Sequence, residues 1–142
     1  MERLEWKRIT EIDPNPKLFG DKQSQIKFGI AGDCYLTAVL ELLDKPEYHK
    51  SLFYTREINQ AGCYIIYFYV NGLRTPVLID DRLPTLKNGK LAFASCENGE
   101  FWAALVEKAW AKLHGSYVRI ENSNAAMLYS ALTGLPCDKL HH

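Results

Sequence analysis

The chain contains one short segment whose residue types could generate a nucleophile, Gly29-Ile30-Ala31-Gly32-Asp33-Cys34-Tyr35-Leu36. A glycine-rich turn delivers Cys34 to the first turn of a predicted amphipathic helix. Partial positive charge at a helix N-terminus lowers the pKa of a cysteine, and the thiolate is the reactive form. Helix-start cysteines of this kind attack acyl groups in enzymes. A buried cysteine that acts as a small apolar side chain is the alternative, and the octapeptide alone favours it.

The composition limits the kinds of partner that the chain can have. Its 17 Lys and Arg residues balance its 17 Asp and Glu residues, and no basic stripe is present, so we expect no nucleic-acid partner. The longest apolar run, Cys63 to Val70, has the length of a strand, so no transmembrane segment is expected. The start, Met1 to Leu4, does not resemble a signal peptide.

The cysteines indicate the cellular compartment. They are widely spaced and form no Cys-x-x-Cys pair that would suggest zinc. Without a secretory signal they are expected to be reduced thiols, which predicts a cytoplasmic, intracellular protein. The four are Cys34, Cys63, Cys96 and Cys137.

The length of 142 residues predicts one domain with a substantial core. We assign residues 1–138 to this domain. Residues 139–142 end in His141 and His142 and are interpreted as the remnant of a purification tag, so they are left out of any argument about metals.

The first half of the domain is expected to contain a strap and a helix. Pro14 and Pro16 break any helix in the segment from Trp6 to Phe28, which should lie over the core as an irregular strap. The residues expected to pin it are Trp6, Leu18 and Phe19. A helix should follow from an Asp33 N-cap down to Pro46, because Leu36, Val39, Leu40 and Leu43 have helical spacing. Residues 46–54 fit a short second helix.

Two turns organise the predicted strands. Asn71-Gly72 is a hairpin signal between Gly62–Val70, expected to be buried on both faces, and Thr75–Asp80, whose Val77 and Ile79 share a face. Asn88-Gly89 repeats the signal, and residues 90–94 are expected to form a third strand.

The second half is expected to be helical. A helix from about Glu100 to Leu113 should be capped by Asn98 or Gly99, should carry Glu100 in its first turn and should stop at Gly115. A last helix should run from about Ser123 to before Gly134. The fold class that these elements predict is α+β, with helices packed against a small antiparallel sheet.

Three blocks of the sequence, in order, resemble motifs of the calpain family of cysteine proteases. Residues 29–36 resemble Gly-x-x-Gly-Asp-Cys-Trp-Leu, with Tyr35 in place of the tryptophan. Residues 80–85 resemble Asp-Asp-Arg-Leu-Pro-Thr. Residues 100–112 resemble Glu-Phe-Trp-x-x-Leu-x-Glu-Lys-Ala-Tyr-Ala-Lys. The resemblance extends from about Trp6 to Leu135 and covers the first, cysteine-bearing subdomain of the protease core.

This resemblance implies one half of a papain-like fold with Cys34 as the catalytic nucleophile. The family takes its histidine base and its orienting asparagine from a second subdomain. We therefore expect the chain to belong to a calcium-regulated endopeptidase that acts on protein substrates, and to be inactive without that second half. His49, in a charged stretch, is expected to be solvated, and His114 to be a charge at a helix end.

Two departures from the family pattern support an alternative. The glutamine that helps to bind the oxyanion is replaced by Phe28. The calcium-binding aspartate is replaced by Gln25, although Glu100 matches a calcium-ligating glutamate. Because an amide is a poorer calcium ligand than a carboxylate, the calcium site is expected to be degraded. The alternatives are a plain helix-start acid for Glu100 and, for the whole chain, a non-catalytic binding or regulatory module, a pseudoprotease.

The other matched residues are expected to be structural. Asp80, Asp81 and Arg82 should form an ion-pair cluster that holds the loop after the second strand. Trp102 and Trp110 should fill the core beneath the cysteine-bearing helix.

Overall fold

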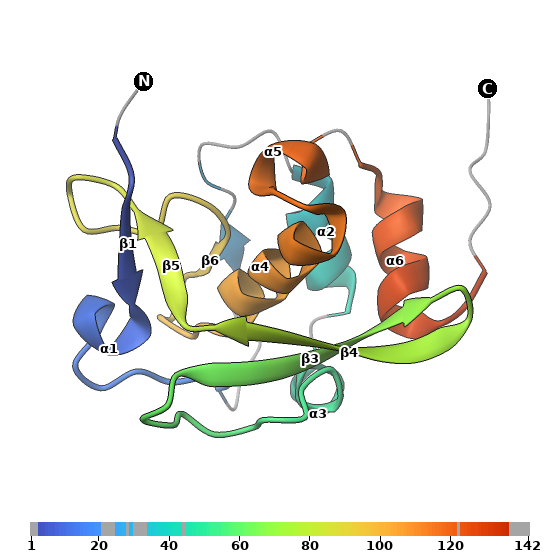
Figure 1. The fold of residues 1–142 in the computed structure, drawn as a ribbon, viewed down its shortest axis with the longest axis horizontal. Coiled ribbons are helices and arrows are strands. Elements are labelled where there is room, and N and C mark those ends of the chain that lie inside the picture. The colour runs from blue at the N-terminus through green and yellow to red at the C-terminus, as the bar shows by residue number, and fades with distance from the viewer. Residues whose placement is uncertain are drawn as a thin grey trace.

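The computed structural model describes residues 3–20, 25–27, 29, 34–43, 45–121 and 123–136. Figure 1 shows helices α2 (Cys34–Leu42), α4 (Trp102–His114) and α6 (Ala125–Thr133) on one side of a long hairpin made by β3 (Cys63–Val70) and β4 (Leu73–Asp80). Three two-stranded antiparallel sheets are formed among the described residues. The α+β class predicted from the sequence is confirmed.

The hairpin β3–β4 is closed by the predicted turn. Asn71 has φ 51° and Gly72 has φ 80°, and two positive values are what a two-residue type I′ turn requires. One face of the hairpin is buried under the helices, with Tyr64, Ile66 and Phe68 from β3 and Val77 and Ile79 from β4. The expected burial of both faces is wrong, because alternate residues of β3 on the other face remain partly exposed.

The segment from Trp6 onward is not the irregular strap that was expected. It contains β1 (Glu5–Arg8), α1 (Ile9–Ile12) and β2 (Ile26–Lys27). β1 pairs with β5 (Arg82–Thr85), and β2 pairs with β6 (Ser95–Cys96). Partners that lie this far along the chain supply hydrogen bonds that local composition does not reveal. Trp6 is 54% exposed and does not pin the segment, whereas Leu18 is buried.

The second turn forms without the strand predicted after it. Gly89 has φ 83°, and the Asn88 side chain accepts a hydrogen bond from the Lys90 amide at 3.0 Å. Beyond the turn only Leu91 bridges back to Thr85, so residues 90–94 are not a strand. The regular pairing of this region is instead made by β5 with β1.

Helix α4 is the central element of the core. Trp102, Leu105 and Val106 are fully buried, and Trp110 is nearly so, which confirms the core role predicted for the two tryptophans. The helix begins two residues after the start predicted near Glu100, because the N-cap residue is Phe101 and Glu100 precedes the helix. The amides of Phe101 and Trp102 donate to the carbonyls of Lys17 and Leu18. These two distant residues therefore cap the helix, in place of the predicted cap, Asn98 or Gly99.

The remaining helices flank α4. α3 (Pro46–Ser51) and α6 match predictions, and Asn124 caps α6 by accepting from the Met127 amide at 3.0 Å. α5 (Tyr117–Ile120) was not predicted, since its four residues are too few for a periodic pattern.

The acidic pair at the end of β4, Asp80 and Asp81, is tied to other elements. Asp81 is almost fully buried and pairs with Arg8 of β1 at 3.0 Å. Asp80 pairs with Lys108 of α4 and accepts from the Arg82 amide. The expected cluster of Asp80, Asp81 and Arg82 is therefore wrong, because the cations come from β1 and α4.

Candidate active site

Helix α2 carries the predicted nucleophile. The helix begins at Cys34 and is held in the core by Leu36, Val39 and Leu40, each 4% exposed or less. This confirms the predicted helix. The side chain of Cys34 lies outside the described part of the structure, as do Phe28 and Asp33, so the predicted N-cap and oxyanion position remain predictions.

The opening glycine of the nucleophile block is required by close packing. A Cβ atom on Gly29 would lie 1.9 Å from the carbonyl oxygen of Ala92. No side chain fits at that distance, so the backbone at Gly29 lies directly against Ala92, in the segment after the Asn88-Gly89 turn. Glycine at position 29 is therefore a packing requirement.

Tyr35, the residue after Cys34, ties the first turn of α2 to two other helices. Its hydroxyl accepts a hydrogen bond from Trp110 Nε1 of α4 at 3.0 Å and donates one to the carbonyl oxygen of Ile120 at the end of α5. No local sequence pattern indicates this link, because the partners of Tyr35 lie 75 and 85 positions further along the chain.

The candidate calcium ligand, Glu100, is 4% exposed, and its carboxylate is occupied by protein donors. Oε1 accepts from the Asn98 side-chain amide at 3.0 Å, and Oε2 accepts from Trp102 Nε1 at 2.9 Å. The backbone of Gly20 lies against the same oxygen, since a Cβ there would be 1.7 Å from Oε1. The alternative of an acid in the first turn of α4 does not hold, because Glu100 precedes that turn.

The described residues do not fit a calcium ion at this position. Calcium prefers six to eight oxygen ligands, with several carboxylates in tight sites. The carboxylate of Glu100 already accepts two N–H groups, and Gln25 is neutral and exposed. Within the described ranges, no group of three or more His, Cys, Asp and Glu side chains could hold a metal. Asp21, an acidic residue next to Gly20 in the sequence, lies outside those ranges.

His49 is buried, which corrects the expectation that it is solvated. It is 5% exposed, and its ring stacks on the indole of Trp102 with 3.6 Å between centroids. Burial lowers the pKa of His49 to about 4, against a hydrogen bond with the backbone of Leu43 that raises it. The charged neighbours in the sequence were misleading, because α3 turns His49 toward the core.

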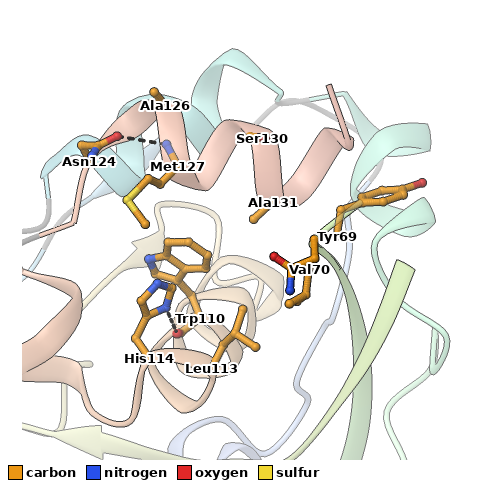
Figure 2. A pocket seen from close by; sticks show the side chains of 11 residues that line it. Tyr69, Val70, Trp110, Leu113, His114, Asn124, Ala126, Met127, Ser130 and Ala131 are labelled. Atoms are coloured by element: carbon orange, nitrogen blue, oxygen red, sulfur yellow. Dashed lines mark hydrogen bonds between the residues drawn. The ribbon is translucent and has the colours of Figure 1, made fainter. Parts of the chain in front are cut away.

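A groove of about 610 Å³ lies between the C-terminal half of α4, the helix α6 and the tip of the hairpin. Figure 2 shows Trp110 and His114 of α4 facing Met127 of α6 at one side of this groove. His114 is the last residue of α4, as predicted, and its Nδ1 lies 3.1 Å from the carbonyl oxygen of Trp110. This histidine therefore contacts its own helix.

Two of the other cysteines are described. Cys63 is exposed, Cys96 is buried, and both are thiols that form no disulfide. They provide internal references against which the reactivity of Cys34 can be measured.

Comparison with known proteins establishes the class. The family model described as "Calpain family cysteine protease" matches residues 1–142, which identifies a domain of the cysteine protease class. The chain belongs to the calpain family. It is 37% identical over 142 residues to Calpain clp-4 of Caenorhabditis elegans, 41% over 138 residues to Calpain-8 of Rattus norvegicus, and 37% over 138 residues to the Calpain-2 catalytic subunit of Homo sapiens.

These matches cover most of this chain and a small part of each relative. They take in 94%, 91% and 92% of the chain, and 19%, 19% and 20% of the three relatives respectively. The chain therefore spans about a fifth of the length of the curated relatives it matches. No helix among the described residues is long and apolar enough to cross a membrane.

Proposed function

We propose that residues 1–138 form the cysteine-bearing half of a calpain-like intracellular endopeptidase, with Cys34 as its nucleophile. The observation that carries this proposal is the start of helix α2 at Cys34, in a chain that belongs to a cysteine protease family. A thiol at a helix N-terminus is favoured as thiolate by the helix dipole. Residues 139–142 are proposed to be a tag remnant that takes no part.

The reaction that this half would perform is acyl transfer from a protein substrate. The thiolate of Cys34 attacks the carbonyl carbon of a peptide bond. The C–N bond then breaks, and the amine leaves with the proton that a histidine base took from the thiol. Water cleaves the resulting thioester and returns the proton to sulfur. The histidine and its orienting asparagine are expected on a second subdomain, since both described histidines are engaged elsewhere.

The backbone amide of Cys34 is the oxyanion donor expected from this half. Phe28 offers no side-chain donor where the family has glutamine, and the loss of one oxyanion donor typically slows turnover about 100- to 1000-fold. We therefore expect a slow protease even when the second half is present. Calcium regulation through Glu100 is not part of this proposal, because the described donors do not fit the ion.

The test is the relative alkylation rate of the four cysteines. Iodoacetamide should modify Cys34 faster than the exposed Cys63 at pH 7, as followed by peptide mass mapping. Cys34→Ala should remove the fast phase, and Cys63→Ala should leave it intact. A rate at Cys34 equal to or below that at Cys63 would contradict an activated nucleophile.

Activity of the chain by itself provides a second test. A casein or peptide substrate should not be cleaved measurably, because the two described histidines contact Trp102 and the α4 backbone, and the base is expected on the second subdomain. Turnover that disappears in Cys34→Ala would show that this chain supplies its own base.

The alternative is a non-catalytic module of the same family. It is favoured by Phe28 at the oxyanion position and by the internally occupied Glu100. Slow alkylation of Cys34, together with no gain in activity for Phe28→Gln in a protein that contains both halves, would support this alternative over the protease.

A further inference from the structure

Two aromatic residues that contact each other have exchanged places relative to the family motifs. The motif around the nucleophile has tryptophan after the cysteine, where this chain has Tyr35. The motif of the later helix has tyrosine at the position of Trp110. In the structure, Trp110 Nε1 donates to the Tyr35 hydroxyl at 3.0 Å. One indole and one phenol thus meet at this contact, with the indole on α4 and the phenol on α2.

The chemistry of the two side chains explains why both positions would change together. An indole N–H can only donate, whereas a phenol hydroxyl can donate and accept. Two indoles at this contact would leave a buried donor without an acceptor, and burial of such a group is unfavourable. Trp110 is 2% exposed, so its N–H depends on Tyr35 for an acceptor.

The phenol also makes the contact a three-way junction. The Tyr35 hydroxyl donates a hydrogen bond to the carbonyl oxygen of Ile120. The same carbonyl also accepts from the Ser123 amide at 3.1 Å. Ile120 ends the short helix α5, where carbonyls lack partners within the helix. The first turn of α2 is therefore held against both α4 and α5 by a single oxygen atom.

We propose that Tyr35 is a positioning residue for Cys34, and that the exchange of Tyr35 and Trp110 preserves the hydrogen bond that performs this role. The inference rests on the proposed function of Cys34. Tyr35 does not touch substrate in this proposal. It acts by fixing the turn of α2 on which Cys34 stands, and therefore the direction of the amides at the helix start.

The reactivity of the Cys34 thiol should therefore depend on the hydroxyl of Tyr35. Tyr35→Phe keeps the ring and removes the junction. The first turn of α2 then loses its fixed orientation, and the interaction of the Cys34 thiolate with the helix terminus weakens. An interaction of this kind corresponds to about half a pH unit in the midpoint of thiolate formation, and to an alkylation rate about threefold slower below that midpoint.

The experiment measures Cys34 alkylation against pH in the full 142-residue chain. Wild type and Tyr35→Phe are compared with Tyr48→Phe, under conditions where circular dichroism shows each to be folded. Tyr48 is a matched control, because its hydroxyl also donates to a helix carbonyl, that of Leu132, at 3.1 Å. We expect the midpoint to rise in Tyr35→Phe only. An unchanged midpoint and rate in Tyr35→Phe would overturn the positioning role.

A double-mutant cycle tests the exchange. Tyr35→Trp and Trp110→Tyr should each lower the urea midpoint of unfolding, and the double variant should recover at least about half of the summed loss, as coupled neighbours do. Additive losses would overturn the exchange. If the double variant does not fold, its losses are not compensated and the exchange fails, while Tyr35→Phe still decides the positioning role.

These outcomes are separable from the fate of the proposed function. If wild-type Cys34 reacts no faster than Cys63, the nucleophile assignment fails, and the positioning role that rests on it fails too. The exchange is then judged by the unfolding cycle alone. If wild-type Cys34 reacts fast and Tyr35→Phe changes nothing, the function stands and only the positioning role is lost.

Discussion

The two regions that the family motifs mark for function differ in how their polar groups are used. In the Glu100 corner, formed by Gly20, His49, Asn98, Glu100 and Trp102, the carboxylate is 4% exposed and both of its oxygens accept from protein donors. At the start of α2, the half-buried Tyr35 joins three helices through one hydroxyl, beside the residue proposed as the nucleophile. In the Glu100 corner the carboxylate oxygens are hydrogen-bonded within the protein. At the start of α2 the Tyr35 hydroxyl fixes the position of the helix against its neighbours.

This difference shows that the residue type at a motif position does not determine its use. Glu100 matches a calcium-ligating glutamate, yet its oxygens hold Asn98 and Trp102 in place. Tyr35 departs from the motif, yet its hydroxyl accepts a hydrogen bond from Trp110 and so links α2 to α4. Changes in the Glu100 corner should therefore affect mainly the free energy of unfolding, and changes at the start of α2 should affect mainly the reactivity of Cys34.

The largest effect is expected from Trp102→Ala. Trp102 has no exposed surface, stacks on His49 and donates to Glu100, so its loss leaves a cavity and a buried acceptor without its donor. Replacement of a core tryptophan by alanine typically costs about 3–5 kcal/mol. Urea unfolding is the measurement, with Trp6→Ala as the control because Trp6 is 54% exposed. Equal losses in the two variants would mean that the Glu100 corner is not a core element.

Acid should weaken the same corner through His49. Its folded-state pKa, about 4, lies below the value near 6.5 of an unfolded histidine. The unfolded chain therefore binds more protons between these values. The stability contributed by neutral His49 is present above about pH 6.5 and is lost as the pH falls toward 4, by at most about 3 kcal/mol.

The control for this acid effect is His49→Phe, which keeps an aromatic ring on Trp102 and removes the titrating group. The difference in unfolding free energy between wild type and this variant should decrease from pH 7 to pH 4. A difference that stays constant over this range would show that His49 does not become protonated on unfolding.

A moderate loss is expected from Glu100→Gln. The amide keeps the volume but offers an NH₂ group where the native carboxylate accepts, so one buried N–H of Asn98 or Trp102 loses its acceptor. The cost should be about 1–3 kcal/mol. Glu97→Gln is the matched control, because Glu97 is exposed and its carboxylate forms a surface pair with Lys27 at 3.9 Å. If both variants unfold at the same urea concentration, the hydrogen bonds that Glu100 accepts from Asn98 and Trp102 contribute nothing to the free energy of unfolding.

The smallest effect is expected from calcium. With Glu100 already occupied, 1 mM calcium should raise the melting temperature by less than about 2 °C, which corresponds to a dissociation constant weaker than about 1 mM. Magnesium at the same concentration is the control. A dissociation constant at or below about 10⁻⁵ M by calorimetry, lost in Glu100→Ala, would show that the corner opens to the ion.

Local patterns predicted the elements whose signals lie within a few residues. The Asn71-Gly72 turn, the apolar spacing of α2 and the glycine stop of α4 were all read correctly, because each depends on backbone conformations or periodicity that neighbours determine. The strap, the strand after Asn88-Gly89 and the cap of α4 were wrong. For the strap and the cap, the deciding hydrogen bonds come from a segment far along the chain, as when Lys17 and Leu18 accept from the start of α4.

The sequence by itself determined the α+β class, the family and the position of Cys34 at a helix start, because turn signals, helical spacing and the order of three motifs are properties of the linear chain. Only the tertiary structure decided that His49 is buried against Trp102, that Glu100 is occupied by Asn98 and Trp102, and that Tyr35 bridges Trp110 and Ile120. The physical reason is that burial and hydrogen-bond partnership depend on which distant side chains packing brings together, and no local pattern carries that information.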